Sequence, residues 1–419
     1  MFEAIVLCLV ATALMSYVNA RFVGLPPTIG VMAIALLISL SLVVLDAFDV
    51  TDLHRVEVEF VSSIDFSKVL MEGMLSMLLF AGALHVDFSL LRRQGWQVAI
   101  LAIFGTALCT LLVGATLWWI LPRIGLSLSP AYCLVFGALI SPTDPIAVMG
   151  MLKAARAPDD VGILVSGESL FNDGVGVVLF SVLLAIAVQG TMPALPDVAM
   201  SLLQEAGGGV VLGAAVGVLA FALLRSIDNY QVEVILTMAA VLGGYQLARL
   251  LHTSGPLAMV VMGLIIGNHG RTNAMSDTTR HHVDLFWELL DGMLNAALFV
   301  LIGLEIVVVP FSYSTMIASA CAILVVLAAR AAATALPILI LRPVLRFPHG
   351  AGTILVWGGL RGGISVALAL SIPAGPSRDL ALGMTYVIVL FSILVQGLTF
   401  KRVAARVMSR EPASPAMGT

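Results

Sequence analysis

The stretch that decides the fold runs from Ala131 to Gly150 and reads AYCLVFGALISPTDPIAVMG. Its first ten residues are almost all apolar, as in a membrane-spanning helix. Pro142 and Pro145 lack a backbone N–H and clash with the preceding turn, so a continuous helix cannot pass through them. Broken backbone at mid-membrane survives only where it is buried in protein or lines a wet cavity. This stretch therefore predicts an interrupted transmembrane helix with a polar site at the break.

The composition of the whole chain places it in a membrane. Of 419 residues, 60% are hydrophobic and only 11% are charged, and the mean hydropathy is +1.07. Because no water-soluble core could bury so much apolar surface, a soluble enzyme, a disordered chain and a fibrous repeat are excluded. The net charge of −4 and the absence of a long basic run offer no footprint for nucleic acid. The expected surroundings are the lipid bilayer.

Thirteen apolar runs approach the length of about 20 residues that a helix needs to cross the hydrocarbon layer. They lie near 3–19, 28–46, 66–85, 97–121, 131–152, 162–188, 199–224, 230–251, 255–268, 283–309, 313–341, 350–372 and 379–404. With an external N-terminus, the cytoplasmic loops hold fourteen Lys and Arg and the external segments four, as the positive-inside rule requires. The sequence predicts an all-α integral membrane protein with a cytoplasmic C-terminus. Residues 1–410 form one polytopic domain, followed by a short disordered tail at 411–419.

The twelfth run contains a second interruption. Near its middle it reads GGLRGG from Gly358 to Gly363, with Arg361 between the two glycine pairs. A pair of interrupted spans in corresponding places of two halves is typical of secondary transporters built from inverted repeats. The alternative is a proline kink in one span and close glycine packing in the other.

The sixth run carries polar side chains inside an apolar stretch. From Gly167 to Gly176 it reads GESLFNDGVG. Helical spacing puts Ser169 and Asp173 one turn apart on one face, with Glu168 and Asn172 one turn apart beside them. A carboxylate at bilayer depth must find a partner, a proton or a cation. A purely structural patch, with Glu168 held by a buried arginine, remains the alternative for that residue.

These three motifs resemble the signatures of the NhaP-type sodium/proton antiporters of the cation/proton antiporter superfamily. The resemblance runs from about residue 65 to residue 400 and rests on SPTDP, GESLFNDG and GGLRGG in the expected order. It implies a secondary antiporter of the cell membrane, not an enzyme, that exchanges Na⁺, or Li⁺ or K⁺, for H⁺ in pH and sodium homeostasis. It also implies a homodimer without a cofactor, and a site where the broken fifth and twelfth spans cross beside the sixth.

The resemblance assigns roles to the polar residues of the fifth and sixth spans. Asp173 is the shared ligand of proton and cation. Ser169 contributes its hydroxyl oxygen, Thr143 a backbone or side-chain oxygen, and Asp144 acts through its side chain or a bound water. Such oxygen ligands suit a hard alkali cation. Asn172 is neutral where another branch of the superfamily has a second aspartate, which implies electroneutral exchange of one proton per cation.

Arginines inside the spans receive structural roles. Arg330, in the eleventh span, stands where relatives carry an arginine that pairs with the sixth-span glutamate, so Glu168 and Arg330 are expected to form a buried ion pair. Arg361 is expected to offset carbonyl ends at the break beside Gly359 or to guard the cavity; snorkelling toward the cytoplasm is the alternative. The core helices then comprise about 66–188 and 283–404, and the scaffold or dimer helices about 1–46 and 199–268.

Two features of the sequence stay open. Relatives carry an acid after a Leu-Leu-Phe run in the third span, and here Ala81 takes that place. Glu72 is a candidate accessory acid for pH sensing or entrance, or an interfacial residue paired with Lys68. Asp291, in the tenth span, lies at helical spacing with Glu288 and Asn295 and has no assigned purpose beyond a preference for the cytoplasmic funnel.

A second class of function also needs buried polar groups in a membrane. An intramembrane protease could use Ser169 as a nucleophile or Asp144 and Asp173 as a carboxylate dyad. The sequence argues against it, because no histidine lies inside a span near Ser169 and no HExxH motif is present. A passive channel is disfavoured because a single titrating aspartate beside broken helices suits exchange.

Overall fold

The computed structural model describes residues 2–48, 58, 61, 68–154, 157–190, 194–270, 275–306 and 312–409, and every regular element within them is helical. The elements of the first half are α1 (Phe2–Val18), η1 (Asn19–Val23), α2 (Pro27–Ala47), η2 (Val69–Met74), α5 (Leu75–Leu84), α6 (Phe88–Arg93), α7 (Gly95–Ile100), η3 (Leu101–Gly105), α8 (Thr106–Ile120), η4 (Leu121–Ile124), α9 (Pro130–Ile140), α10 (Ile146–Ala154) and α11 (Asp159–Gln189).

The second half combines long helices with short ones around the second interruption. They are α12 (Leu195–Arg225), α13 (Tyr230–Leu250), α14 (Gly255–Ile265), η5 (Ile266–Gly270), α16 (Asp277–Glu305), α17 (Tyr313–Leu341), α18 (Ala351–Trp357), α19 (Gly363–Leu370), α20 (Pro376–Phe391), η6 (Ser392–Gly397) and α21 (Leu398–Met408). The tail at 411–419 lies outside the described residues.

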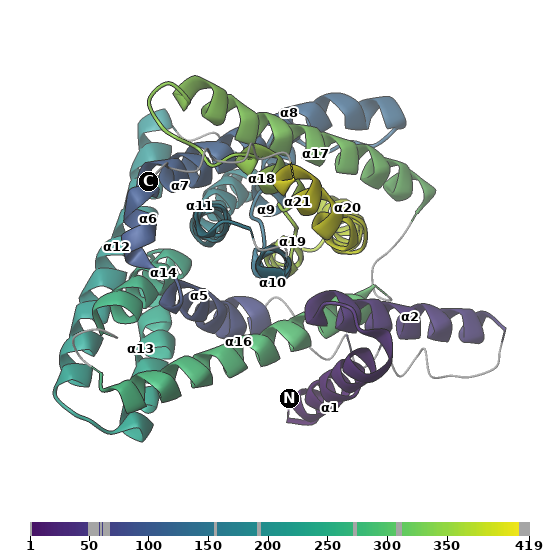
Figure 1. Cartoon of the computed structure of the whole chain (residues 1–419). Helices are drawn as coiled ribbons and strands as arrows, with labels where there is room; N and C mark the ends of the chain where they lie inside the picture. Colours follow the sequence, from purple (N-terminus) through teal and green to yellow (C-terminus); the bar gives the residue numbers. More distant parts are fainter. Residues whose placement is uncertain are drawn as a thin grey trace.

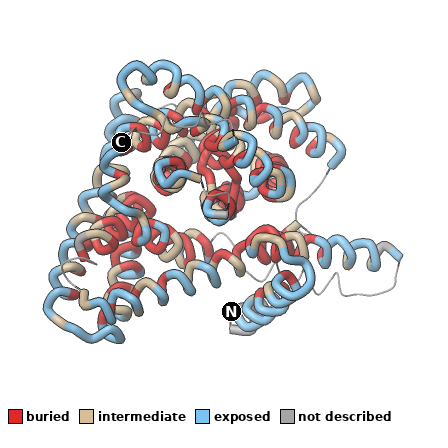
Figure 2. The backbone as a smooth tube through the Cα atoms, viewed as in Figure 1, coloured by how far each residue is buried: buried red, intermediate tan, exposed pale blue. Residues whose placement is uncertain are grey.

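The helices form a central group surrounded by a frame (Figure 1). Helices α10, α11 and α20 are seen end-on at the centre, α8 and α17 cross above them, and α16 runs below. Helices α12, α13 and α14 close the left side, and α1 and α2 extend at the lower right. Buried residues concentrate in the central group and along α5 and α14, whereas α1, α2, α12 and α17 carry long exposed stretches (Figure 2). Those exposed faces are apolar, as expected of surfaces that meet lipid.

Nine helices in the described part of the chain are long and apolar enough to cross a membrane by length and composition. Shorter apolar helices occupy Val69–Leu84, Pro130–Ile140 and Gly255–Asn268. The described residues of the thirteen predicted runs are helical apart from the interruptions in the fifth and twelfth runs and turns at the ends of a few runs. The protein is therefore an all-helical, multi-span membrane protein.

Local sequence chemistry explains where the interrupted helices begin and end. Helix α9 starts after Ser129, whose hydroxyl accepts a hydrogen bond from the backbone N–H of Tyr132, and Pro130 fills the first helical position. The helix ends at Ile140 and α10 begins only at Ile146. Helix α18 ends at Trp357 and α19 begins at Gly363, so the glycine-rich stretch separates them. Both interruptions fall where the prolines and glycines predict them.

Candidate cation and proton site

The broken stretch of residues 141–145 lies between two neighbours. On one side is α11, where Gly176 faces Pro142 so closely that a Cβ atom would overlap the proline ring. On the other side is the glycine-rich stretch between α18 and α19, whose Leu360 carbonyl accepts a hydrogen bond of 2.8 Å from the backbone N–H of Asp144. The glycines therefore allow the two broken stretches and the polar face of α11 to meet.

Thr143 connects the break to α11. Its backbone N–H donates to Oδ1 of Asn172 at 3.2 Å, and its hydroxyl lies 3.0 Å from the hydroxyl of Ser169. The amide nitrogen of Asn172 donates to Oγ1 of Thr143 at 2.9 Å. All three side chains are buried. The structure thus brings together Thr143, Ser169 and Asn172, which lie on two separate segments in the sequence.

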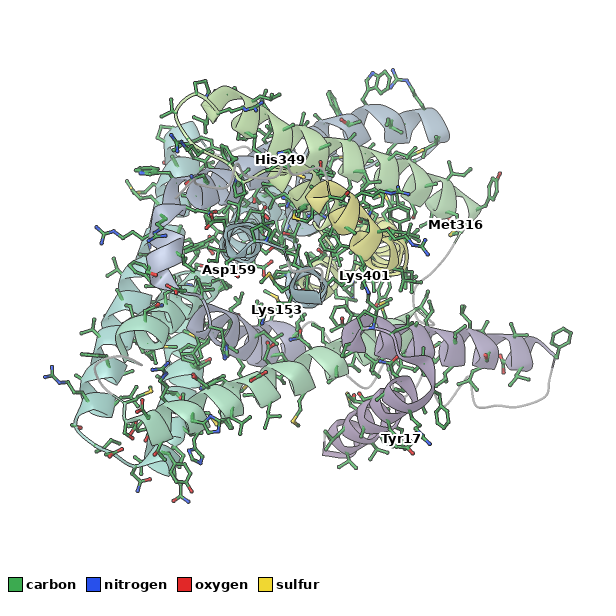
Figure 3. The ribbon with its side chains drawn as sticks, viewed as in Figure 1. Tyr17, Lys153, Asp159, Met316, His349 and Lys401 are labelled. Carbon is green, nitrogen blue, oxygen red and sulfur yellow. The ribbon has the colours of Figure 1, made fainter. Side chains whose placement is uncertain are left out.

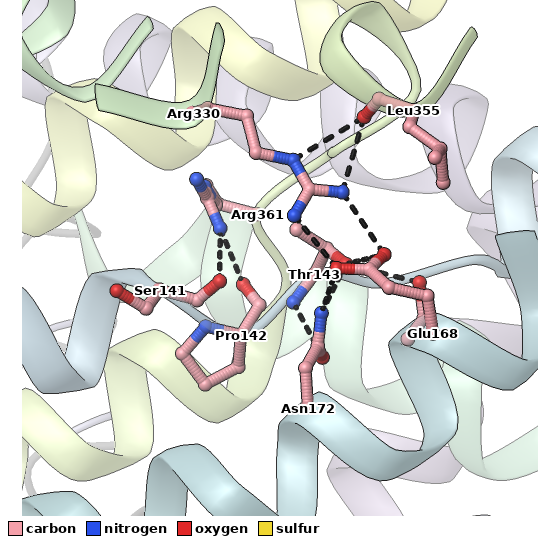
Figure 4. Close-up of polar contacts among 9 residues, drawn as sticks. Ser141, Pro142, Thr143, Glu168, Asn172, Arg330, Leu355 and Arg361 are labelled. Atoms are coloured by element: carbon pink, nitrogen blue, oxygen red, sulfur yellow. Dashed lines mark hydrogen bonds and ion pairs between the residues drawn. The ribbon is translucent and has the colours of Figure 1, made fainter. Parts of the chain in front are cut away.

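Glu168 is occupied by an ion pair. Nη1 and Nη2 of Arg330, on α17, donate to its two carboxylate oxygens at 2.7 and 2.9 Å, and Asn172 donates a third hydrogen bond at 2.9 Å. Arg330 also donates to the Leu355 carbonyl of α18, at 3.3 Å from Nε and 3.1 Å from Nη2 (Figure 4). Glu168 is 1% exposed and Arg330 is 6% exposed. The charge of Glu168 is therefore balanced by Arg330.

Arg361 is turned into the protein. Its backbone N–H donates to Oγ of Ser392 at 2.9 Å, and Nη1 donates to the carbonyls of Ser141 and Pro142, the latter at 2.9 Å (Figure 4). These carbonyls follow the end of α9, where helix geometry leaves backbone acceptors unpaired. With 2% of its surface exposed, Arg361 does not snorkel toward water, so that alternative is wrong. A positive charge covers the negative end of the half-helix.

The two aspartates differ from Glu168 in their surroundings. Oδ1 of Asp144 accepts a hydrogen bond of 2.9 Å from the Ile146 N–H and so caps α10. Asp173 is 7% exposed, and no described residue gives its carboxylate a hydrogen bond or an ion pair. Both aspartates line one cavity of 960 Å³. Asp173 is thus a buried carboxylate that only a proton, water or a cation from this cavity can satisfy.

Further acidic residues line the same cavity. Glu288 and Asp291 project from α16, and Oδ1 of Asp291 accepts a hydrogen bond of 3.0 Å from Asn295. Asp87 and Asp159 also line it, and hydrogen bonds from the side chain and backbone of Ser89 hold the pKa of Asp87, in the loop before α6, below its usual value. An acidic wall attracts cations toward the site.

The sequence motifs did not identify every residue of this cavity. His85, Asp87 and Ser365 line it, but none of them belongs to a polar motif inside an apolar run. Glu72 lies in η2, and its side chain is outside the described residues, so its accessory role stays a prediction.

An all-helical membrane fold with a buried carboxylate that lines a cavity beside broken helices is typical of ion transporters. Residues 9–406 match the family described as sodium/hydrogen exchanger, transmembrane. The chain belongs to this family, which confirms the resemblance noted from its three motifs. Members of this family are transporters and not enzymes, so the alternative of an intramembrane protease is set aside.

Individual relatives agree over the full chain. The protein is 49% identical over 422 residues to the Na⁺/H⁺ antiporter NhaP of Pseudomonas aeruginosa, with 100% of both chains covered. It is 32% identical over 400 residues to the Na⁺/H⁺ antiporter NhaH of Halobacillus dabanensis, covering 94% and 95% of the two chains. Its fold is similar to that of the sodium proton antiporter MjNhaP1 of Methanocaldococcus jannaschii at pH 8, with a TM-score of 0.77 at 20% identity over 97% and 99% of the chains.

Proposed function

We propose that this protein exchanges Na⁺ for H⁺ across a cell membrane, with Asp173 as the group that carries either ion. The observation that supports this assignment is the contrast between two acids five positions apart on α11. Glu168 is neutralised by Arg330, whereas the Asp173 carboxylate is buried, unpaired within the described residues and open to the 960 Å³ cavity. The relatives named above, which are Na⁺/H⁺ antiporters, support the same function.

The exchange follows from competition for one carboxylate. A proton or an alkali cation each neutralises Asp173, and neither can bind while the other is present. The Ser169 and Thr143 hydroxyls, 3.0 Å apart, supply neutral oxygens close to α11 for a desolvated Na⁺, Li⁺ or K⁺. Because a neutral site crosses the low-dielectric region at lower cost than an anionic one, the loaded states alternate their access and the empty state does not. Ion and proton flux are thereby coupled.

The charge balance of the site favours electroneutral exchange. Asn172 is neutral and donates hydrogen bonds to Glu168 and Thr143, so it adds no second exchangeable charge. Oδ1 of Asp144 accepts a hydrogen bond from the Ile146 N–H and caps α10, and we assign Asp144 a supporting role through a bound water or its other carboxylate oxygen. One carboxylate then carries one proton or one monovalent cation per cycle.

We propose thirteen spans for the membrane topology, with an external N-terminus and the broken spans at 131–152 and 350–372 crossing at the site. The hydrogen bond from Asp144 to Leu360 supports this contact between them. Residues 66–188 and 283–404 form the core, and residues 1–46 and 199–268 form the scaffold. The scaffold carries the contact of a homodimer in this proposal, since α12 exposes long apolar stretches.

Exchange in proteoliposomes tests the function. The purified protein is reconstituted in liposomes that trap a pH dye, and an inward Na⁺ gradient is applied. The lumen should become alkaline, because each Na⁺ that enters is exchanged for an H⁺ that leaves. Asp173→Asn should abolish the signal, and Asp291→Asn is the matched control that removes an acid from the cavity wall. Transport by Asp173→Asn at the wild-type rate would refute the assignment. A voltage clamp with K⁺ and valinomycin tests electroneutrality, because a rate that follows the membrane potential contradicts it.

A further inference from the structure

A second cavity, apolar and of 510 Å³, is bounded by α17, α18 and α21, and none of its lining residues lines the cavity of the exchange site. Ala331, Ala335 and Leu339 of α17 form one wall, and Val356, Trp357 and Val403 contribute to the others. The neighbouring side chains Leu336 and Ile340 of α17 are exposed. A groove on an exposed apolar surface of a membrane-spanning helix is open to lipid.

The groove has the length and direction of a lipid chain. From Ala331 to Leu339 it follows α17 for eight residues, or roughly 12 Å at 1.5 Å per residue. One leaflet of the hydrocarbon layer is about 15 Å thick, half of about 30 Å. The inner end of the groove lies beside Arg330, which reaches the exchange site, and the other end lies at the terminus of α17. An acyl chain of one leaflet therefore fits along it.

Basic residues gather at the end of the groove that is farther from Arg330, where α17 ends. Arg342 follows Leu339 by three positions at the end of α17, and Arg406 follows Val403 by three positions in the last turn of α21. Both are exposed, and neither forms an ion pair within the described residues. Gly350 abuts Val407, so the end of α21 lies against the loop that leads from Arg342 into α18. Figure 3 labels His349, in the loop that precedes α18, and Lys401, in the first turn of α21.

Acidic residues that could neutralise these arginines are distant along the chain. Between Arg342 and Ser409 the sequence has a single acid, Asp379. It lies in the first turn of α20, at the opposite end of the continuous helix Pro376–Met408 that carries Arg406. Because neither arginine has an ion-pair partner within the described residues, this end of the groove carries positive charge, which complements a phosphate headgroup at the membrane surface.

We propose that an anionic diacyl phospholipid binds here, with one acyl chain in the groove and its phosphate at Arg342 and Arg406. The site lies against the half-helix α18, whose Leu355 carbonyl accepts from Arg330 and whose Trp357 donates to Thr399 of α21 at 3.1 Å. A bound lipid holds α18 between α17 and α21, next to the glycine-rich break that leads into α19. Occupancy therefore stabilises one wall of the exchange site.

Lipid binding is measured on the purified protein without transport, so its failure is distinct from a failure of the proposed exchange. Dioleoyl phosphatidylglycerol and dioleoyl phosphatidylcholine are titrated into the full chain in neutral detergent, and bound lipid is counted by native mass spectrometry. The anionic lipid should bind and raise the melting temperature, and the zwitterionic lipid should not. Equal binding of the two lipids would overturn the proposal.

Two pairs of variants locate the lipid. Arg342→Gln with Arg406→Gln should weaken phosphatidylglycerol binding by about 30-fold, roughly fivefold per arginine. Arg92→Gln with Arg225→Gln removes two exposed charges elsewhere and should leave binding unchanged. Ala335→Trp fills the groove and should abolish binding, whereas Leu336→Trp, on the exposed face beside it, should not. Wild-type affinity in either the double arginine variant or Ala335→Trp refutes the site.

Discussion

The buried pair of Glu168 and Arg330 makes a prediction that can be followed through in free energy. Replacing Glu168 by Ala removes two charge-assisted hydrogen bonds, of 2.7 and 2.9 Å, and among the described residues leaves Arg330 with the carbonyl of Leu355 as its acceptor. Because Arg330 is 6% exposed, water cannot replace the lost carboxylate. Breaking a buried pair of this kind costs about 3–5 kcal/mol.

Removing both partners should cost less than removing one. Glu168→Leu together with Arg330→Met leaves no uncompensated charge, and such apolar replacement of a buried pair is often neutral or stabilising. We therefore expect each single variant to melt well below the wild type and the double variant to recover most of the loss. The loss of stability in the double variant should be smaller than the sum of the two single losses, and the coupling free energy should exceed about 2 kcal/mol.

Thermal unfolding of the purified variants in detergent, followed by tryptophan fluorescence, gives the four corners of this cycle. Asp173→Asn is the matched control, since it alters an acid five positions away on the same helix that makes no ion pair within the described residues. Its melting temperature should stay at or above that of the wild type. Losses that simply add in the double variant, or a stable but inactive Glu168→Ala, would refute the structural role of the pair.

Three further predictions concern the surroundings of the site. Gly176→Ala should destabilise the protein by about 1–3 kcal/mol and slow exchange, because the new methyl overlaps the ring of Pro142; Gly162→Ala in the same helix, whose Cβ would lie 3.5 Å from Cε of Met149, is the control in the same melting assay. Asn172→Asp should lower both melting temperature and exchange rate, because it replaces the donor to Glu168 by a second carboxylate; a rate at or above wild type contradicts this. Asp87→Asn tests pH dependence: the lowered pKa of Asp87 stabilises the fold above the ordinary value of about 3.9, and this contribution disappears as the pH falls through the lower folded-state pKa. The difference in melting temperature between wild type and variant should therefore be full at about pH 7 and shrink as the pH falls below about 3.9. A difference that grows with acid would reject the reasoning.

The family and the broken helices could be predicted from the chain because their causes are local. Pro142, Pro145 and the glycine pairs around Arg361 interrupt a helix whatever packs beside them. Likewise, the composition and length of the apolar runs require a membrane before any contact is known. The positions of Ser169, Asn172 and Asp173 on one side of α11 follow from helical periodicity alone.

The acids of the cavity could not be predicted with the same security. Asp87 lies in a loop and Asp291 on α16, about 200 residues apart in the sequence, and only packing places both on one cavity wall with Asp144. Helical periodicity assigns a face to a residue, but it does not say which other helix that face meets. For the same reason the chain alone left open whether Arg361 snorkels to the surface or turns inward to the carbonyls of Ser141 and Pro142.

The amino-acid sequence by itself determined that this is a membrane protein with two interrupted helices and a polar face on a third, because backbone chemistry and hydropathy act within a few residues. The tertiary structure decided which of two neighbouring acids is free. Arg330 lies 162 positions from Glu168 along the chain, and its approach from α17 neutralises Glu168 and leaves Asp173 facing the cavity. Electrostatic pairing in a low-dielectric interior depends on distance in space, and no property of α11 alone contains that distance.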